Sequence, residues 1–307
     1  MAQTKMKKKG ANTSLVFTNK MYFFLIPALA FFLIFWIYPV LQLFYYSVTN
    51  FNGVNYDFDF VGMKNYIKVL NNGTLTNSMK NTLVYAVITV LLSNVVGLAV
   101  AMILNTKIRL KGLFRTCAYF PALFSAIVIG FIWSYVYMPG SGMIASILSM
   151  IGLDGAAFNP LGNYKTALYA IAIVEAWKAF GTTMIIYLAG LQTVDESLLE
   201  AGRIDGCTEW QLFRKIVLPL VAPGIAAVSM LSFMYAWNEY TYTVIFTRTA
   251  VNNTVPLALA LLNTEDNLTN FGLVAAGGVV SVIPITLFVI FAQNYLISGL
   301  SSGAVKE

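Results

Sequence analysis

The stretch Thr193–Pro219, TVDESLLEAGRIDGCTEWQLFRKIVLP, is the longest charged and helix-patterned segment that lies between two apolar runs of the chain. Thr193, with Glu196 three residues later, matches a capping box, in which two side chains satisfy free backbone groups at the start of a helix. We therefore expect a helix to begin near Val194.

A glycine turn and a second helix are expected in the same stretch. Gly206 suits the left-handed conformation that closes a helix, and Thr208 with Gln211 forms a second potential cap. The first helix would carry Glu200, Ala201 and Gly202 on a face whose small side chains let another protein approach closely. The predicted helix, turn and helix has the shape of a docking element, although an ordinary interhelical loop with well-formed caps has the same local pattern.

The composition of the chain indicates a membrane protein. Of its 307 residues, 58% are hydrophobic and 10% are charged, whereas a soluble protein normally holds about a quarter of its residues as charge. The absence of histidine excludes histidine-based catalysis, metal ligation and proton relays. The two cysteines, Cys117 and Cys207, have no metal-ligand spacing, so no metal site is expected. The sequence contains no GxxxxGK phosphate loop, so any nucleotide that drives this protein is expected to bind elsewhere.

Six apolar runs are each long enough to cross a bilayer, which needs about 20 helical residues. They are Met21–Val48, Asn81–Asn105, Leu113–Tyr137, Thr166–Gly190, Pro219–Thr247 and Phe271–Leu296. A shorter apolar helix is expected from Met143 to Ile151, in the loop after the third run. We predict an all-α integral membrane protein with six transmembrane helices, organised as one domain over 21–307 behind a basic leader over 1–20.

Lysine and arginine are distributed unevenly between the two sides of this arrangement. With the N-terminus inside, 13 of the 19 basic residues fall on the inner side and 5 on the outer side, while Lys178 lies within a span. Because basic residues accumulate in cytoplasmic loops, both termini and the stretch Thr193–Pro219 are expected to be cytoplasmic. The same distribution accounts for the formal net charge of +6 without a nucleic-acid partner.

Charged side chains at bilayer depth are costly, so they usually face a cavity or one another. One helical stripe of the fourth run holds Glu175, Lys178 and Thr182, and one stripe of the fifth holds Ser232, Tyr235, Glu239 and Tyr242. Both stripes are expected to line a central substrate pathway. Two plainer interpretations stay open: a mutual ion pair of Glu175 with Lys178, and a Glu239 side chain that reaches the outer interface.

The spacing of residues within Thr193–Pro219 resembles the EAA signature of ABC-importer permeases. The matching residues are Glu200, Ala201, Gly206, Ile216, Leu218 and Pro219, and Gly202 stands where the signature has its second alanine. FVGMKNY at Phe60–Tyr66 and the C-terminal region ending in GAVKE are similar to the corresponding parts of carbohydrate permeases. The resemblance extends over Met21–Glu307.

The resemblance implies a type I ABC-importer permease fold, with Thr193–Pro219 as a cytoplasmic helix-turn-helix coupling segment between the fourth and fifth transmembrane helices. It implies that coupling to two cytoplasmic ATPase subunits runs through Glu200, Ala201, Gly202, Gly206, Ile216, Leu218 and Pro219. The chain would be no enzyme and would hold no cofactor, because ATP and Mg²⁺ would bind the ATPase partners. Other expected partners are an extracytoplasmic solute-binding protein and a second permease, expected to be a different chain, although a second copy stays open. The expected location is a bacterial-type plasma membrane, crossed several times.

In permeases of the maltose type, the sugar binds between the helices that precede and follow the EAA loop. These are the helices that carry the two stripes, so the resemblance implies a carbohydrate substrate, a di- or oligosaccharide, bound near them. The residue types differ from the maltose set, so the location of the site carries over better than the identity of the sugar. An alternative is an ion- or proton-coupled secondary sugar transporter, in which Glu175, Lys178 and Glu239 would form a relay.

Overall fold

The computed structural model describes residues 23–55, 57–247, 249–262 and 270–304, and its regular structure there is helical. Extended pairing is limited in these residues to one isolated bridge, between Thr49 and Phe60. The expected leader over 1–20, and the basic residues Arg248 and Lys306, lie outside the described residues. The prediction of an all-α membrane protein is confirmed, since five described helices are long and apolar enough to cross a bilayer, or six if one bent pair counts as a single span.

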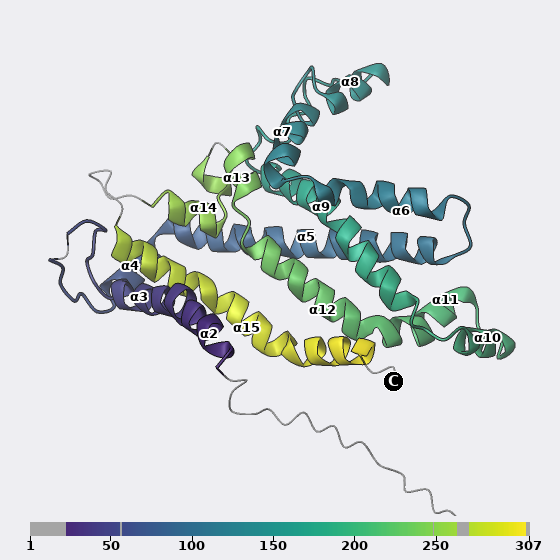
Figure 1. Cartoon of the computed structure of the whole chain (residues 1–307). Helices are drawn as coiled ribbons and strands as arrows, with labels where there is room; N and C mark the ends of the chain where they lie inside the picture. Colours follow the sequence, from purple (N-terminus) through teal and green to yellow (C-terminus); the bar gives the residue numbers. More distant parts are fainter. Residues whose placement is uncertain (1–22, 56, 248, 263–269, 305–307) are drawn as a thin grey trace, which may run out of the picture.

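The elements follow one another along the chain as labelled in Figure 1. The first part contains α2 (Leu25–Phe32), η1 (Leu33–Ile37), α3 (Tyr38–Ser47), α4 (Lys64–Asn71), α5 (Gly73–Asn105), α6 (Lys111–Tyr119), η2 (Phe120–Leu123), α7 (Ala126–Val136) and α8 (Met143–Met150). The second contains α9 (Ala167–Leu191), α10 (Glu196–Ile204), α11 (Glu209–Leu212), η3 (Phe213–Val217), α12 (Leu218–Trp237), α13 (Thr241–Phe246), η4 (Ala250–Asn252), α14 (Val255–Ala260) and α15 (Phe271–Ala304).

Helices α5, α9 and α12 form the centre of the bundle. Half of the most apolar window of α9 is buried, and the core packed around it contains Tyr85, Ile171 and Trp237. The Thr183 hydroxyl on α9 donates a hydrogen bond to the carbonyl oxygen of Ser93 on α5 at 2.9 Å. Interhelical hydrogen bonds of this kind help to hold membrane helices together, because the hydrophobic effect does not drive helices to associate inside a lipid bilayer.

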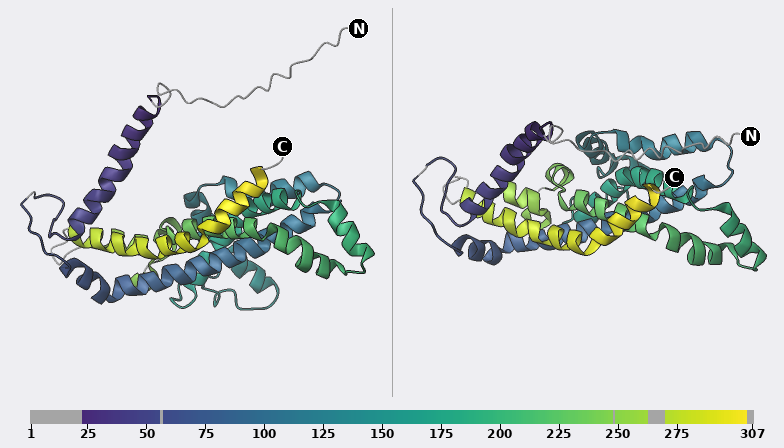
Figure 2. Two further views of the ribbon diagram at one scale, coloured as in Figure 1. Left: turned by 90° about the horizontal axis from the view of Figure 1, so that it is seen from below. Right: turned by 60° about the horizontal axis from the view of Figure 1, so that its bottom comes forward.

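The first apolar helix stands apart from this centre. Leu25–Ser47 is continuous over 23 residues, and its most apolar window contains no buried side chain. Figure 2 shows α2 leaving the bundle, while the far end of α3 lies against α15. Uncovered apolar side chains along a whole helix are what lipid or another membrane subunit would cover.

The prediction that the third apolar run forms a single straight helix is wrong. The chain bends by 99° between Lys111–Leu123 and Ala126–Val136. The bend lies at Phe124 and Ser125, whose backbones are extended, and the Ser125 hydroxyl caps α7 by accepting the N–H of Val128 at 3.3 Å. Hydrophobicity alone predicts one continuous helix over this apolar run, but the capping serine starts a new helix within it.

The second predicted span is longer than expected. Helix α5 begins at Gly73, eight residues before Asn81, because Asn72 caps it by accepting the N–H of Leu75 at 3.1 Å. The fourth predicted span and the short apolar helix near Met143 are confirmed as α9 and α8.

Candidate coupling segment and substrate cavity

The first helix of the predicted coupling segment begins two residues later than expected. Asp195, rather than Thr193, caps α10, and its carboxylate accepts the N–H of Ser197 at 2.9 Å. The Thr193 hydroxyl instead donates to the carbonyl oxygen of Gly190, at the end of α9. The acidic residues Asp195 and Glu196 therefore lie at the positive end of the short helix, where a negative charge is favourable.

The glycine turn is confirmed. Gly206 has φ of +81°, a conformation that costs a residue with a Cβ about 1 kcal/mol. The N–H of Cys207 donates to the carbonyl oxygen of Gly202 at 3.0 Å, and that of Gly206 donates to Arg203 at 3.0 Å. This pair of bonds is the Schellman arrangement, which satisfies the last free carbonyls of a helix.

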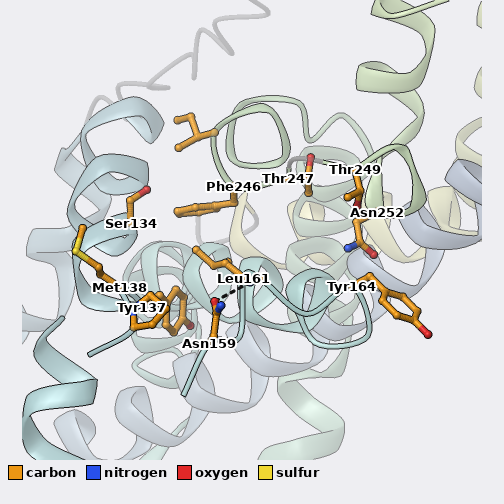
Figure 3. Close-up of a pocket in the computed structure, with 13 residues that line it drawn as sticks. Ser134, Tyr137, Met138, Asn159, Leu161, Tyr164, Phe246, Thr247, Thr249 and Asn252 are labelled. Atoms are coloured by element: carbon orange, nitrogen blue, oxygen red, sulfur yellow. Dashed lines mark hydrogen bonds between the residues drawn. The ribbon is translucent and has the colours of Figure 1, made fainter. Parts of the chain in front are cut away.

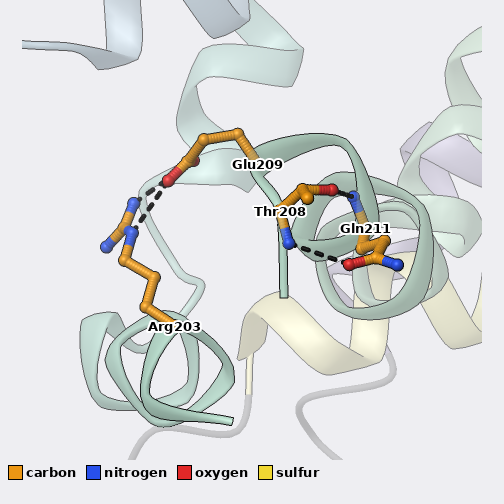
Figure 4. Close-up of polar contacts among 4 residues, drawn as sticks. All are labelled: Arg203, Thr208, Glu209 and Gln211. Atoms are coloured by element: carbon orange, nitrogen blue, oxygen red, sulfur yellow. Dashed lines mark hydrogen bonds and ion pairs between the residues drawn. The ribbon is translucent and has the colours of Figure 1, made fainter. Parts of the chain in front are cut away.

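The second cap is also confirmed, and a charge pair ties the two short helices together (Figure 4). The N–H of Thr208 donates to Gln211 Oε1 at 2.8 Å, while the Thr208 hydroxyl accepts the N–H of Gln211 at 3.3 Å. Arg203 Nε on α10 lies 2.9 Å from Glu209 Oε1 on α11. The hydrogen bond that Arg203 donates to this carboxylate raises the pKa of its guanidinium, but both side chains are exposed, so solvent screening limits the stabilisation.

Gly202 does not lie on the outer docking face, contrary to expectation. It is buried, and a Cβ built on it would lie 2.5 Å from Leu212 Cδ2 and 2.9 Å from Ile216 Cδ1. The small residue therefore lets α10 pack closely on α11 and η3. Glu200, Ala201 and Gly206 are exposed, so these three predicted docking residues lie on the outward surface of the segment.

This packing predicts different outcomes for two substitutions at Gly202. Gly202→Ala should be tolerated, because the methyl group meets only the ends of two flexible side chains and alanine favours the helix by up to about 1 kcal/mol. Gly202→Leu should separate the two short helices, since overpacking costs about 1–3 kcal/mol. Solute uptake measured in cells, with the membrane content of the chain as a control, should stay near wild type for the first variant and fall strongly for the second. Equal uptake by both variants would contradict the packing.

The second short helix is continuous with a membrane span. Glu209–Trp237 forms one helix of 29 residues, composed of α11, η3 and α12. The π-helical segment η3, Phe213–Val217, ends two residues before Pro219, as η1 ends two residues before Pro39. Proline lacks the N–H that an α-helix needs, and a wider π turn accommodates this missing bond. Helices α11 and α12 are therefore joined without a break in the helix.

A cavity of about 360 Å³ lies midway along the bundle, between α5, α9 and α12. Five of the seven predicted substrate-pathway residues line it, namely Glu175, Lys178, Thr182, Ser232 and Tyr235. The two stripes on α9 and the first part of α12 therefore meet as expected. The third wall, formed by Thr89 and Ser93 of α5, was not predicted, because isolated hydroxyl residues in an apolar run carry no distinctive spacing.

Glu175 and Lys178 form no close ion pair, although Lys178 attracts Glu175 electrostatically from a greater distance. The one ion pair within 4.0 Å among the described residues is that of Arg203 with Glu209, and neither Glu175 nor Lys178 makes a side-chain hydrogen bond to a described residue. The interpretation of these two residues as a mutual ion pair is therefore wrong for this structure. Two opposite charges face one cavity, and neither has a close ion pair or a side-chain hydrogen bond with a described residue, which is costly at bilayer depth unless a ligand or water occupies the cavity.

Glu239 and Tyr242 do not line this cavity, because α12 ends at Trp237 and the predicted fifth span is broken there. Glu239 is 9% exposed, and its Oε1 accepts the N–H groups of Tyr242 and Thr243 in the first turn of α13. The interpretation of Glu239 as an interfacial side chain is therefore wrong, since the carboxylate is buried and bound. Tyr242 is fully buried, and its hydroxyl has no hydrogen-bond partner among the described residues.

Together, the apolar bundle, the mid-bundle cavity and the protruding helix-turn-helix define a membrane permease. A family model described as "Binding-protein-dependent transport system inner membrane component" matches residues 93–302, and the chain belongs to this family. The predicted ABC-importer permease is thus confirmed, and family membership decides against a secondary transporter. It also establishes a protein of the plasma membrane that crosses the bilayer several times.

Several named relatives are similar to this chain over most of its length. The "Probable starch degradation products transport system permease protein AmyD" of Thermoanaerobacterium thermosulfurigenes is 30% identical, over 76% of this chain and 78% of the relative. The "Multiple sugar-binding transport system permease protein MsmF" of Streptococcus mutans is 30% identical, over 86% and 93%. The "sn-glycerol-3-phosphate transport system permease protein UgpA" of Agrobacterium fabrum is 31% identical, over 74% and 77%.

The fold is shared with a solved ABC transporter. A chain of the bacterial alginate ABC transporter, in complex with an alginate pentasaccharide-bound periplasmic protein, matches with a TM-score of 0.76 and 21% identity. The match covers 90% of this chain and 93% of that chain. The predicted type I ABC-importer permease fold is confirmed.

Proposed function

We propose that this permease carries a neutral carbohydrate, a di- or oligosaccharide, as half of the translocation pathway of an ABC importer. The observation that carries the proposal is the cavity between α5, α9 and α12, which Glu175 and Lys178 line without a close ion pair to any described residue. A sugar hydroxyl donates to a carboxylate and accepts from an ammonium group, so neighbouring hydroxyls can engage both charges. The relatives named for starch products and for multiple sugars support the same substrate class.

The proposed contacts come from both helices beside the coupling segment. Glu175, Lys178 and Thr182 on α9 would bind hydroxyl groups, with Ser232 across the cavity on α12. Tyr235 is 77% exposed, and its ring would offer an aromatic face to the apolar side of a sugar ring. Glu239 and Tyr242 would act behind this wall, by fixing the start of α13.

The coupling segment is proposed to be cytoplasmic, together with both termini. Two groups of basic residues support this orientation, because the segments that carry them, the start of α6 and the coupling segment, lie at the same end of the molecule (Figure 1). They are Lys107, Arg109 and Lys111 around the start of α6, and Arg203, Arg214 and Lys215 in the coupling segment. Positive charge accumulates on the cytoplasmic side of membrane proteins.

The partners would be two cytoplasmic ATPase subunits, a second permease and an extracytoplasmic solute-binding protein. ATP with Mg²⁺ would bind the ATPase subunits, and this chain would hold no cofactor and form a single transmembrane domain over 21–307. Glu200, Ala201 and Gly206 would meet the ATPase, while Gly202 and Ile216 hold the two short helices together and Leu218 with Pro219 joins them to α12. Closure of the ATPase pair would tilt α11 and α12 as one rod and change which side of the membrane the cavity faces.

The energy source tests this proposal. The complete complex, reconstituted in liposomes with its binding protein, should accumulate a labelled saccharide when the ATPase subunits are supplied with ATP. Collapse of the proton and sodium gradients by ionophores should leave that uptake unchanged. Uptake that needs an ion gradient and ignores ATP would contradict the proposal and restore the secondary transporter.

A further inference from the structure

A second cavity, of about 580 Å³, lies away from the mid-bundle cavity, and none of the residues that line the one lines the other. Three separate groups of residues form it: the end of α7, the loop before α9, and described residues from the end of α13 to η4, namely Ile245, Phe246, Thr247, Thr249 and Asn252. In Figure 1 these segments lie away from α10 and α11, on the side of the bundle that the proposed orientation places outside.

Two asparagine amides face this cavity with hydrogen-bonding capacity to spare (Figure 3). Asn252 is 6% exposed, and its side-chain amide has no hydrogen-bond partner among the described residues. Asn159 uses its Oδ1 to accept the N–H of Gly162 at 2.9 Å, which leaves its amide NH₂ group free to donate. Asn159 is exposed, and the amide atoms of Asn252 are not among the fully enclosed unsatisfied side-chain atoms of the described residues, so both amides are accessible to a ligand or to water.

The backbone that carries Asn252 is fixed by side chains from another helix. Asn77 and Asn81 of α5 both donate to the carbonyl oxygen of Val251, each at 2.7 Å, and Asn81 also donates to that of Asn253 at 3.1 Å. The backbone on both sides of Asn252 is therefore held in place before any ligand arrives. Such preorganisation reduces the ordering that binding would require.

Aromatic rings complete the walls of this outer cavity. Tyr137, Tyr164 and Phe246 line it, and Phe246 stacks on Tyr242 with ring centroids 6.1 Å apart. Among the described residues that line the cavity, none is charged. Aromatic faces with neutral amides match the two kinds of surface on a sugar ring, which are apolar C–H faces and hydroxyl edges.

We propose that this outer cavity, formed around Asn159, Asn252 and Phe246, is a second binding site for a neutral saccharide, occupied before the mid-bundle cavity. The inference rests on the proposed function in that the transported solute is a carbohydrate. Each asparagine amide would donate to and accept from neighbouring hydroxyls, and an aromatic ring would cover the apolar face of one sugar unit. The site would receive the saccharide at the outer end of the pathway.

Equilibrium binding to the complete complex in lipid nanodiscs tests the proposal. The probes are ¹⁴C-labelled maltose, maltotriose and raffinose, measured by scintillation proximity without the binding protein. Wild type should show two classes of site per permease chain for at least one probe. Asn159→Ala and Asn252→Leu should each weaken saccharide binding at the same class of site by about 3- to 10-fold, the effect of losing a neutral hydrogen bond. Lys178→Met should weaken the other class only.

Asn163→Ala is the matched control. The Asn163 Oδ1 accepts a backbone N–H from Lys165 at 3.0 Å, as that of Asn159 does from Gly162, but Asn163 does not line the cavity. It should retain both classes of site. If Asn252→Leu lowers the melting temperature, Asn159→Ala, which lies on a different loop, decides the result alone.

The possible failures are distinguishable. Two classes of site that both survive Asn159→Ala and Asn252→Leu, or a single class that only Lys178→Met affects, would overturn the outer site and leave the proposed function intact. No binding of any neutral probe by wild type, with binding of a uronic-acid or amino-sugar disaccharide instead, would overturn the proposed neutral substrate itself.

Discussion

Gly206→Pro is expected to abolish uptake while the chain still inserts into the membrane. Gly206 has φ of +81°, and its N–H donates to the carbonyl oxygen of Arg203. Proline holds φ near about −65° and has no N–H, so the turn between α10 and α11 cannot form. The apolar spans that direct insertion are untouched. Saccharide uptake should fall below detection, and the amount of the chain in the membrane fraction should equal that of wild type.

Gly152→Pro provides a matched control for this prediction. Gly152 also has φ of +81° and donates its N–H, to the carbonyl oxygen of Ser149, and no atom lies within 4 Å of a Cβ built at either glycine. Gly152 lies in the loop after α8, away from both the coupling segment and the cavities. It should retain most of the uptake. Equal loss in both variants would mean that any strained turn disrupts the protein.

The exposed face of α10 predicts a similar loss. Glu200→Lys should prevent coupling, because it reverses the charge of an exposed side chain without changing the packing around Gly202. ATPase subunits should no longer co-purify with this variant, while the chain stays in the membrane. Normal uptake by Glu200→Lys would contradict the role of this face in docking.

Removal of either charge in the mid-bundle cavity is expected to lower saccharide uptake by about 10- to 100-fold, the effect of losing a hydrogen bond to a charged group. Glu175 and Lys178 make no ion pair with each other, so each is available to the substrate. Glu175→Gln and Lys178→Met should therefore each impair uptake, measured in proteoliposomes with the ATPase subunits bound.

The double variant distinguishes substrate binding from a structural role. If the two charges only stabilised each other, Glu175→Gln with Lys178→Met would leave neither charge unpaired and would recover most of the uptake. If both bind the saccharide, the double variant should be at least as impaired as the worse single variant. Recovery of uptake would contradict the proposed contacts.

Local signals predicted the coupling segment well because they depend on neighbouring residues alone. The left-handed Gly206 and the capping box of Thr208 with Gln211 were both confirmed. The start of α10 was misplaced because Thr193 and Asp195 are both capping residues, and the sequence does not show that the Thr193 hydroxyl is engaged with Gly190 at the end of α9.

The breaks in the membrane spans were missed because hydrophobicity hides them. Ser125 and Glu239 stand within long apolar runs, yet each accepts backbone N–H groups that begin a new helix. A search for capping residues inside these runs could have found both breaks. The break after Trp237 also explains why the predicted stripe on the fifth span holds only for its first half, which contains Ser232 and Tyr235.

The composition of the mid-bundle cavity depends on tertiary contacts that spacing does not reveal. Two turns of α9 were identified from charges in an apolar run, whereas Thr89 enters the cavity wall only because α5 packs against α9. Gly202 is a similar case, since a small residue can equally face a partner or a neighbouring helix. Its burial against Leu212 and Ile216 decides between these possibilities.

The central claim is that the coupling segment meets a cytoplasmic ATPase, and site-specific photo-crosslinking tests it most directly. Ile204 in α10 is 80% exposed, and Val54 in the loop before α4 is 73% exposed. Helices α10 and α4 lie at opposite ends of the molecule (Figure 1). A photoreactive amino acid at position 204 should cross-link to the ATPase subunit, and one at position 54 should not. A cross-link from position 204 to the extracytoplasmic binding protein, or from position 54 to the ATPase, would contradict the account.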